Sequence, residues 1–401
     1  MKTVFMHICR HRNTDGTWCL KKSPEISLYG KPIQCKDAHK YLGLLFDASL
    51  RWHKHIEYLR IECQKRLNIL KYLSHANWGA DSKTMLRIYT AYIKPKIEYG
   101  VEAYGSACAS MLKKLDPLQN ASLRIATGAY RTSPVDSIEV IAGIKPLSLS
   151  REEKMANYMV RIISTPQNPL KELFRNPSQM PEQMTKFEQN SIKHRIKHTA
   201  KKYDVKSNMI IEEIIPDHPP WEISGISTCE EITQIVKRDS NPHSMKARYT
   251  AHIDTHDSMQ FTAYTDGSKT EKGVAYAFTA KGPNIPAINK AVRMNDASSI
   301  FSAELHAILG ALNAGIQKGA SRMTVFTDSK SSIQAVMKPY HRNPTVIKIQ
   351  KTVHQTSSKL HMCWIPSHVG INGNETADSL ANNATTSTTR WKNKLTREEY
   401  R

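Results

Sequence analysis

Two strand-like segments of the chain each end at an aspartate, and this repeated arrangement restricts the fold more than any other feature. Residues 260–265 are rich in Phe, Thr and Tyr and stop at Asp266, which indicates a strand that ends at the aspartate. Residues 323–327 repeat the pattern before Asp328, and residues 329–337 then take up helical spacing. The pattern therefore predicts an α/β domain with carboxylates at its strand ends.

Two further acidic residues, Glu304 and Asp378, lie on predicted helices. The residues four before, four after and eight after Glu304 are apolar, so this carboxylate lies on the buried stripe of its helix: Ile300, Ile308 and Leu312. Asp378 lies in the first turns of a last helix, over about residues 374–384. A buried carboxylate stays ionised only beside a cation or hydrogen-bond donors. With the two strand-end aspartates, these residues predict a carboxylate cage for Mg²⁺.

A glycine-containing loop separates the last predicted strand from the last helix. Residues 359–365 are typical of a strand, and residues 366–373 contain Gly370 and Gly373, which favour a mobile loop. His368 is the one imidazole in that loop. Because histidine titrates near neutral pH, His368 is a candidate to act on a reacting phosphate or an attacking water.

Taken singly, each of these residues has an ordinary explanation as a turn, a helix cap or a solvated side chain; their order and flanks carry more. Residues 258–389 resemble a ribonuclease H domain of the kind attached to reverse transcriptases of non-LTR (jockey-like) retrotransposons. The family order Asp, Glu, Asp, His, Asp is matched residue by residue: Asp266, Glu304, Asp328, His368 and Asp378. Residues 364–370, Trp-Ile-Pro-Ser-His-Val-Gly, are characteristic of that group, as are Gly-Asn-Glu at 373–375 and Ala-Asp at 377–378.

The resemblance implies both a fold and a reaction. The fold is a ribonuclease H-like mixed five-stranded sheet flanked by helices, with three antiparallel strands first and two more added in parallel. The reaction is hydrolysis of the RNA strand of an RNA–DNA hybrid, giving 5′-phosphate and 3′-hydroxyl ends. Two Mg²⁺ ions are implied, and Mn²⁺ can replace Mg²⁺ in an all-oxygen site.

The resemblance also implies a division of roles among the site residues. Asp266 bridges both metal ions, Glu304 and Asp328 serve the ion beside the leaving 3′ oxygen, and Asp378 serves the ion that activates water. His368 helps to position water or to release product, so its loss is expected to cost less than the loss of a carboxylate. All four carboxylates are therefore expected to be metal ligands.

Recognition of RNA requires contact with 2′-hydroxyl groups in a wide, shallow minor groove. Candidates for that contact are Gly267, Ser268 and Ser329. Two other functions remain open: a catalytically inactive, nucleic-acid-binding remnant of a transposon, and another nuclease of the same superfamily that acts on DNA.

The preceding part of the chain, residues 1–165, is mostly helical by pattern and resembles the palm end and thumb of a non-LTR reverse transcriptase. The resemblance rests on ordered short motifs at residues 2–6, 40–44, 92–100 and 142–147. The family's polymerase turn carries an Asp-Asp pair, and the chain contains no Asp-Asp dipeptide. No polymerase activity is therefore expected from this chain alone, and the missing pair points to a truncated open reading frame or a partial gene model. Prolines punctuate residues 166–257, which predicts an irregular basic linker, and residues 390–401 are predicted to be a tail.

Composition points to a polyanionic partner. The chain has 57 Lys and Arg against 36 Asp and Glu, a net charge of +21. Such a surplus favours binding to nucleic acid, here an RNA–DNA hybrid. Seven cysteines without a Cys-x-x-Cys pair favour reduced thiols in an intracellular protein, nuclear or cytoplasmic. No membrane span is expected, because no apolar run is long enough to cross a bilayer.

Overall fold

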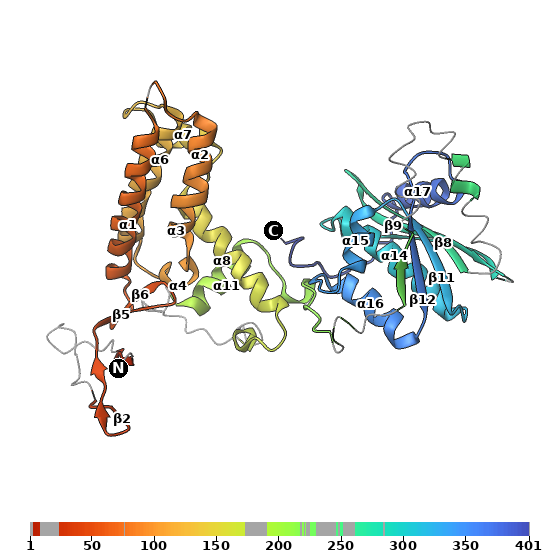
Figure 1. Ribbon diagram of the computed structural model, residues 1–401, viewed down its shortest axis with the longest axis horizontal. Helices are drawn as coiled ribbons and strands as arrows, with labels where there is room; N and C mark the ends of the chain where they lie inside the picture. Colours follow the sequence, from red (N-terminus) through yellow and green to blue (C-terminus); the bar gives the residue numbers. More distant parts are fainter. Residues whose placement is uncertain are drawn as a thin grey trace. The chain divides into compact units, whose positions relative to one another are not determined.

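The computed structural model describes residues 3–8, 24–75, 77–172, 191–216, 219, 221, 225–229, 246–247, 249–251, 261–283 and 285–400 (Figure 1). The chain divides into two compact units: Met1–Met159 with Glu172–Val205, and Val160–Lys171 with Lys206–Arg401. Among the described residues, no helix has both the length and the apolar character that a membrane span requires.

The first unit is mainly helical. Its helices are α1 (His53–Leu73), α2 (Ser82–Ile88), α3 (Lys94–Glu98), α4 (Val101–Tyr104), α5 (Ala109–Leu112), α6 (Asp116–Thr127), α7 (Val135–Ala142), α11 (Ile192–Lys202) and most of α8 (Leu147–Ser164). Its short strands pair as β1 (Val4–Phe5) with β4 (Gln34–Cys35), β2 (Ser27–Leu28) with β3 (Lys31–Pro32), and β5 (Ala38–Tyr41) with β6 (Leu44–Asp47).

The apolar stripe of α1 forms part of the core of this unit. The buried residues of that stripe recur at three- or four-residue steps: Ile56, Leu59, Cys63, Leu67 and Leu70. Asp81 caps α2 by accepting a hydrogen bond from the Thr84 amide at 2.9 Å. A π-helical turn, η1 (Tyr89–Ile93), follows α2 and changes the phase of the stripe. After this turn Ile93 is the buried residue of the stripe, whereas Tyr92 is exposed.

The second unit is built on a mixed sheet in the order β10-β9-β8-β11-β12-β7. The strands are β7 (Ile226–Thr228), β8 (Phe261–Thr270), β9 (Gly273–Gly282), β10 (Ile285–Arg293), β11 (Arg322–Thr327) and β12 (Lys359–Trp364). β8, β9 and β10 pair antiparallel, and β11 and β12 continue the sheet in parallel from β8. This confirms the predicted mixed sheet with its antiparallel and parallel parts.

The sheet has one strand more than the five that were predicted. β7 comes from the segment predicted to be irregular and pairs in parallel with β12, with Leu360 opposite Ile226. Pairing with β7 satisfies backbone groups of β12 that would otherwise lie at an open edge. Three residues are too few to show an alternating pattern in the sequence, which explains why this strand was not predicted.

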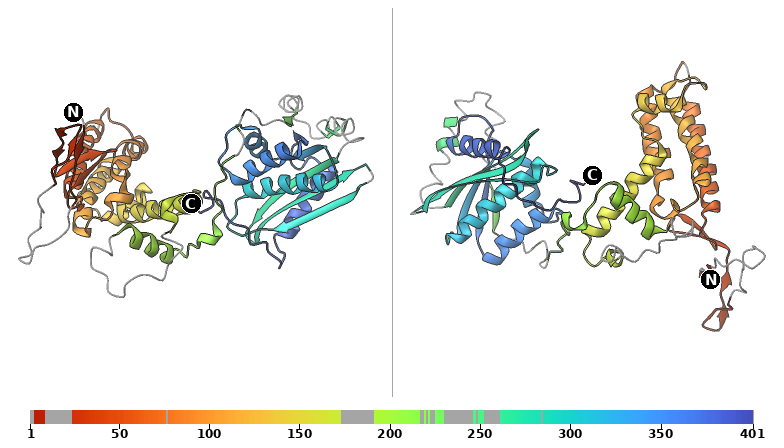
Figure 2. Two further views of the ribbon diagram at one scale, coloured as in Figure 1. Left: turned by 90° about the horizontal axis from the view of Figure 1, so that it is seen from below. Right: turned by 180° about the vertical axis from the view of Figure 1, so that it is seen from behind.

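Helices cover both faces of the sheet (Figures 1 and 2). α14 (Ile300–Gln317), α15 (Lys330–Met337) and α16 (Pro344–Thr356) enclose the larger core of the unit with one face. α17 (Asn372–Ala384) lies on the opposite face, where Ala377 packs in a second cluster with Tyr264, Phe326 and Ile365. The strand ends and the first turns of α14 and α17 are thereby brought to one edge of the domain.

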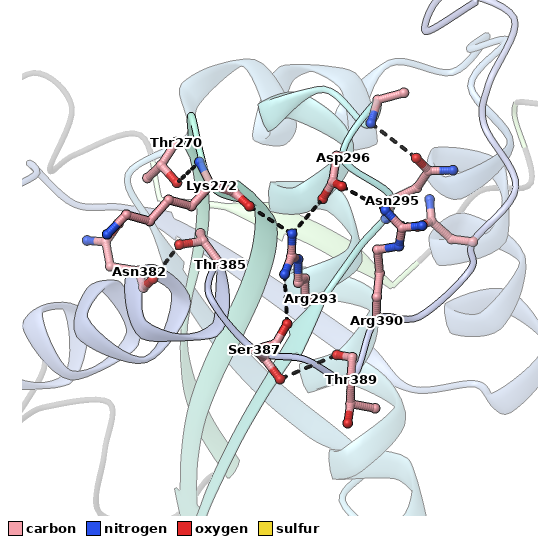
Figure 3. A network of polar contacts seen from close by, with 12 residues as sticks. Thr270, Lys272, Arg293, Asn295, Asp296, Asn382, Thr385, Ser387, Thr389 and Arg390 are labelled. Atoms are coloured by element: carbon pink, nitrogen blue, oxygen red, sulfur yellow. Dashed lines mark hydrogen bonds and ion pairs between the residues drawn. The ribbon is translucent and has the colours of Figure 1, made fainter.

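The end of α17 is held to the sheet by a polar network around Arg293, the last residue of β10 (Figure 3). The Arg293 guanidinium donates to the carbonyls of Ser387 and Lys272, both at 2.7 Å, and to Asp296 at 3.2 Å. Arg390 forms an ion pair with the other carboxylate oxygen of Asp296 at 2.7 Å. This network ties the segment after α17 to the β8–β9 turn and to the end of β10.

The residues predicted to form a tail pack on the second unit. The Trp391 amide donates to the Arg293 carbonyl at 2.8 Å, and the indole ring lies 5.3 Å from the His306 ring. Asn393 accepts a hydrogen bond from the Asn295 amide, and Leu395 forms a β-bridge with Ile210. The described part of this segment is therefore integrated into the domain.

Candidate functional site

Strand register brings the first two predicted acidic residues together. Thr265 of β8 lies opposite Thr327, the last residue of the neighbouring parallel strand β11. Asp266 and Asp328 each follow directly in sequence, so the two residues lie side by side. β11 ends before Asp328 as predicted, but β8 does not end at Asp266: it continues to Thr270 because it pairs there with β9. Asp266 is 7% exposed, and Asp328 is half-buried.

Glu304 reaches this edge from the second turn of α14. Ser299 caps the helix by accepting a hydrogen bond from the Ser302 amide at 3.1 Å. Glu304 is 7% exposed, as its apolar neighbours predicted. β8 passes very close to the helix here, because a Cβ atom at Gly267 would lie 2.7 Å from the Glu304 backbone nitrogen. Gly267 therefore permits the packing that places Glu304 beside the two aspartates.

These three residues form what we call the inner carboxylate cluster: Asp266, Glu304 and Asp328. One carboxylate oxygen from each lies within 4.8 Å of the others. Burial, followed by the charges of Asp328 and Asp378, raises the pKa of Asp266 to about 7. Burial and the two neighbouring aspartates also raise the pKa of Glu304 well above its ordinary value. Without a cation beside it, the cluster retains protons at a pH at which an exposed carboxylate would be ionised.

The inner carboxylate cluster fits a hard divalent cation. Its donors are all oxygen atoms, which is the ligand set that Mg²⁺ and Mn²⁺ prefer. The Oε2 atom of Glu304 is buried and has no hydrogen-bond partner. An unpartnered buried carboxylate oxygen is costly, and a cation would both coordinate it and relieve the repulsion with Asp266 and Asp328.

A second group of three, the outer cluster, lies on the loop before α17 and on its first turns: His368, Glu375 and Asp378. One ligand-type atom from each lies within 4.8 Å of the others. His368 is exposed and has a left-handed backbone, with φ of 56°. Asp378 raises the pKa of Asp266 and His368 lowers it, so the two clusters act on each other electrostatically.

Two polar residues that sequence patterns did not single out complete this part of the site: Glu375, a member of the outer cluster, and Asn382, which lies beside it. Glu375 accepts a hydrogen bond from the Gly370 amide at 3.1 Å, which holds the loop of His368 to α17. Asn382 donates to Asp378 at 2.8 Å and accepts a hydrogen bond from Ser268. Glu375 lies three residues before Asp378 and Asn382 four residues after it, which places all three on one face of the helix. This spacing is the sequence pattern from which the two residues could have been predicted.

The three candidate substrate-binding residues lie around the inner cluster. The Gly267 amide donates a hydrogen bond that lowers the pKa of both Asp266 and Glu304. The Ser268 hydroxyl is buried and donates to Asn382, and the Ser329 hydroxyl lies 2.8 Å from that of Ser332. Both hydroxyl groups are thus engaged within the protein.

Comparisons with known proteins agree with this fold. Residues 258–386 match the family model for RNase H. Over 137 residues the chain is 28% identical to the retrovirus-related Pol polyprotein from type-1 retrotransposable element R1 4 of Nasonia vitripennis, covering 34% of this chain and 35% of that protein. Over 154 residues it is 25% identical to the RNA-directed DNA polymerase from mobile element jockey of Drosophila funebris, covering 38% and 17%.

A solved structure is also similar: RNase H1 from the halophilic archaeon Halobacterium salinarum NRC-1. It shares 19% identity with a TM-score of 0.26, covering 31% of this chain and 96% of that one. The matched part of the chain spans about a third or less of the length of the two retrotransposon relatives. The predicted RNase H domain, with non-LTR retrotransposon polymerases as relatives, is confirmed.

Proposed function

We propose that this chain hydrolyses the RNA strand of RNA–DNA hybrids by two-metal-ion catalysis and leaves 5′-phosphate and 3′-hydroxyl ends. The RNase H domain supports hybrid ribonuclease activity in general. The observation that carries the proposal for this chain is the inner carboxylate cluster, in which Glu304 Oε2 is buried without a partner. A group of buried carboxylates with raised pKa values is costly to the fold, and a catalytic cation site accounts for it.

The proposed metal ligands are Asp266, Glu304, Asp328 and Asp378. Two Mg²⁺ ions, or Mn²⁺ in their place, would when bound stabilise the charge on the attacking and leaving oxygens of an in-line displacement. Asp266 belongs to the inner cluster and interacts electrostatically with Asp378 and His368 of the outer cluster, so it would serve both ions. Glu304 and Asp328 would hold the ion beside the leaving 3′ oxygen. Asp378, which accepts a hydrogen bond from Asn382, would hold the ion that activates water.

His368 would act beside these carboxylates rather than among them. It is exposed and lies within 4.8 Å of Glu375 and Asp378 through one ring nitrogen. An imidazole there can orient the attacking water or take up a proton as product leaves. The hydrogen bond from Gly370 to Glu375 restrains the loop that carries it.

Selection of the hybrid would use groups beside the inner cluster. We propose Gly267 through its backbone, and Ser268 and Ser329 through hydroxyl groups that exchange an internal partner for a 2′-hydroxyl. We also propose that residues 1–165 correspond to the palm end and thumb of a reverse transcriptase without its polymerase site. The predicted basic linker, residues 166–257, is not a separate region, because α11 belongs to the first unit and β7 to the sheet of the second. The net charge of +21 suits the chain to bind the phosphate backbone.

The test is a cleavage assay on the purified chain with an end-labelled RNA annealed to DNA, in Mg²⁺, Mn²⁺ or a chelator. We expect metal-dependent cleavage of the RNA strand alone, with 3′-hydroxyl ends that a polymerase can extend. Asp328→Asn should abolish it, and the control Glu271→Gln, which removes an exposed acid from the same domain, should retain it.

Other substrates separate the alternative functions. Cleavage of a DNA duplex at equal or higher rate would contradict the proposal in favour of a DNA-directed nuclease. Tight binding of the hybrid without cleavage in either metal would contradict it in favour of a nucleic-acid-binding remnant.

A further inference from the structure

A group of three metal-ligand residues lies at the β7 edge of the sheet. β12 carries His361 and Cys363, which alternate and therefore share one face of the strand. β7 runs parallel to β12 with Ser227 opposite His361, so Cys229, just after β7, lies beside Cys363. The two sulfur atoms and one imidazole nitrogen all lie within 4.8 Å of one another. The chain thus places two thiols and an imidazole together from segments 132 residues or more apart.

The residues around this group are arranged as a second shell would be. Ser227 Oγ lies 2.9 Å from His361 Nδ1, a contact of the kind that orients the imidazole of a ligand histidine. Tyr249 is 2% exposed, and its hydroxyl is buried without a hydrogen-bond partner. Tyr249 packs in one cluster with Cys363 and Cys229, and both thiols, after burial, raise the pKa of its hydroxyl.

We propose that Cys229, His361 and Cys363 bind a zinc ion, with the Tyr249 hydroxyl at the fourth coordination position. Sulfur and nitrogen donors favour zinc over Mg²⁺, so this site and the inner carboxylate cluster select different ions. Both thiols lose their protons on binding, so binding weakens as the pH falls. The ion would join the short edge strand β7 and the segment of Tyr249 to β12. This site is independent of the ribonuclease activity proposed above.

The Cys363 sulfur is buried within the domain. The half-buried His361 and Cys229 still leave a route by which an ion reaches the group.

The test measures metal content of the purified full chain after dialysis against buffer with Mg²⁺. We expect one zinc per chain in the wild type and in the control Cys108→Ser, which alters an exposed cysteine of the other unit. Cys229→Ser and His361→Gln, both at half-buried positions, should lose the zinc. Replacement of zinc by Co²⁺ should give a thiolate charge-transfer band and intense tetrahedral bands in the wild type and in Cys108→Ser, but not in Cys229→Ser or His361→Gln.

Removing the ion supplies a second readout that a purely structural role of the cysteines would not give. A zinc-selective chelator should raise the number of thiols that react with a thiol reagent by two and lower the melting temperature, and zinc should restore both. A folded, zinc-free wild type whose thiols are already reactive would overturn the proposal. So would zinc retained in Cys229→Ser, or a Cys229–Cys363 disulfide found by mass spectrometry.

Discussion

The inner carboxylate cluster and the outer cluster carry similar side chains in different surroundings. Asp266 and Glu304 are each 7% exposed, whereas in the outer cluster His368 is exposed and Glu375 and Asp378 are half-buried. In the inner cluster, burial is the largest cause of the raised pKa of every member. Solvent screens charges at the outer cluster much more effectively.

Under the proposed function, this difference separates residues whose burial lowers the stability of the metal-free fold from residues whose presence costs little stability. Buried like charges destabilise the fold unless a cation joins them, so the inner cluster is a source of strain in the metal-free protein. The outer cluster imposes little such cost and can adapt to water and substrate. Removing an inner carboxylate should therefore affect activity and metal-free stability in opposite directions, and removing an outer residue should mainly affect rates.

The largest effect is expected for Asp266→Asn. Activity should fall by about three orders of magnitude, equivalent to about 4 kcal/mol of transition-state stabilisation, because Asp266 would serve both proposed ions. The metal-free variant should nevertheless melt at a higher temperature than the wild type at about pH 8, since the repulsion is gone. Cleavage kinetics and thermal melts in a chelator measure the two effects. If the metal-free variant is less stable than the metal-free wild type, then the inner cluster does not destabilise the fold and does not differ from the outer cluster in this respect.

The next effect concerns pH. The pKa of Asp266 is about 7 in the fold against an ordinary 3.8, so the folded state holds the proton more tightly than the unfolded state. That contribution to metal-free stability is present below about pH 4 and is lost as pH rises through about 7. Metal needs the ionised carboxylate, so the rise in melting temperature that Mg²⁺ causes should grow between about pH 6 and pH 8. Asp266→Asn should flatten that dependence; a dependence that persists in the variant would assign it to another group.

His368→Ala should have a smaller effect. The rate should fall by about tenfold to a hundredfold, at or below the low end of what a positioned acid–base group supplies. Metal-free stability should change little, because the side chain is exposed. Single-turnover cleavage separates a defect in the chemical step from slow product release, which would lower only the steady-state rate. A loss as large as that of Asp266→Asn would show that the outer cluster is not the more tolerant one.

Sequence patterns predicted the parts of this domain that follow a local rule. The strand that ends before Asp328 and the apolar stripe around Glu304 are short-range features, and the structure has both. The predicted strand end at Asp266 was wrong, because pairing with β9 carries β8 on to Thr270, yet the structure still brings Asp266 beside Glu304 and Asp328. The parallel partner of β12 was missed, because a three-residue strand forms through pairing with a distant segment and not through its own sequence.

The support of the site was harder to predict than its carboxylates. Asn382 links Asp378 to Ser268 of β8 through side-chain contacts that depend on how α17 lies across the sheet. Cys229 and Cys363 are far apart in sequence, so only the strand order makes them neighbours. Residue type indicates what chemistry is available, and tertiary packing decides which residues share it.

The smallest effect on catalysis is expected where the sheet holds the end of α17. Arg293→Lys should retain the charge and lose the planar group that bonds Ser387, Lys272 and Asp296 together. The Arg293 side chain is 18% exposed, and the loss of its hydrogen bonds should lower the free energy of unfolding by about 2 kcal/mol. Activity should fall only a few-fold, because the network lies at the opposite end of α17 from His368 and Glu375.

Arg390→Lys is the matched control for that variant. Its ion pair with Asp296 is more exposed, 42% and 46% for the two side chains, and such pairs contribute about 0 to 1 kcal/mol. Denaturant unfolding of both variants, with Mg²⁺ titrations of cleavage, separates stability from site geometry. If Arg293→Lys weakens Mg²⁺ binding far more than it lowers stability, then the outer cluster depends on the exact placement of α17, and its tolerance is narrower than its exposure suggests.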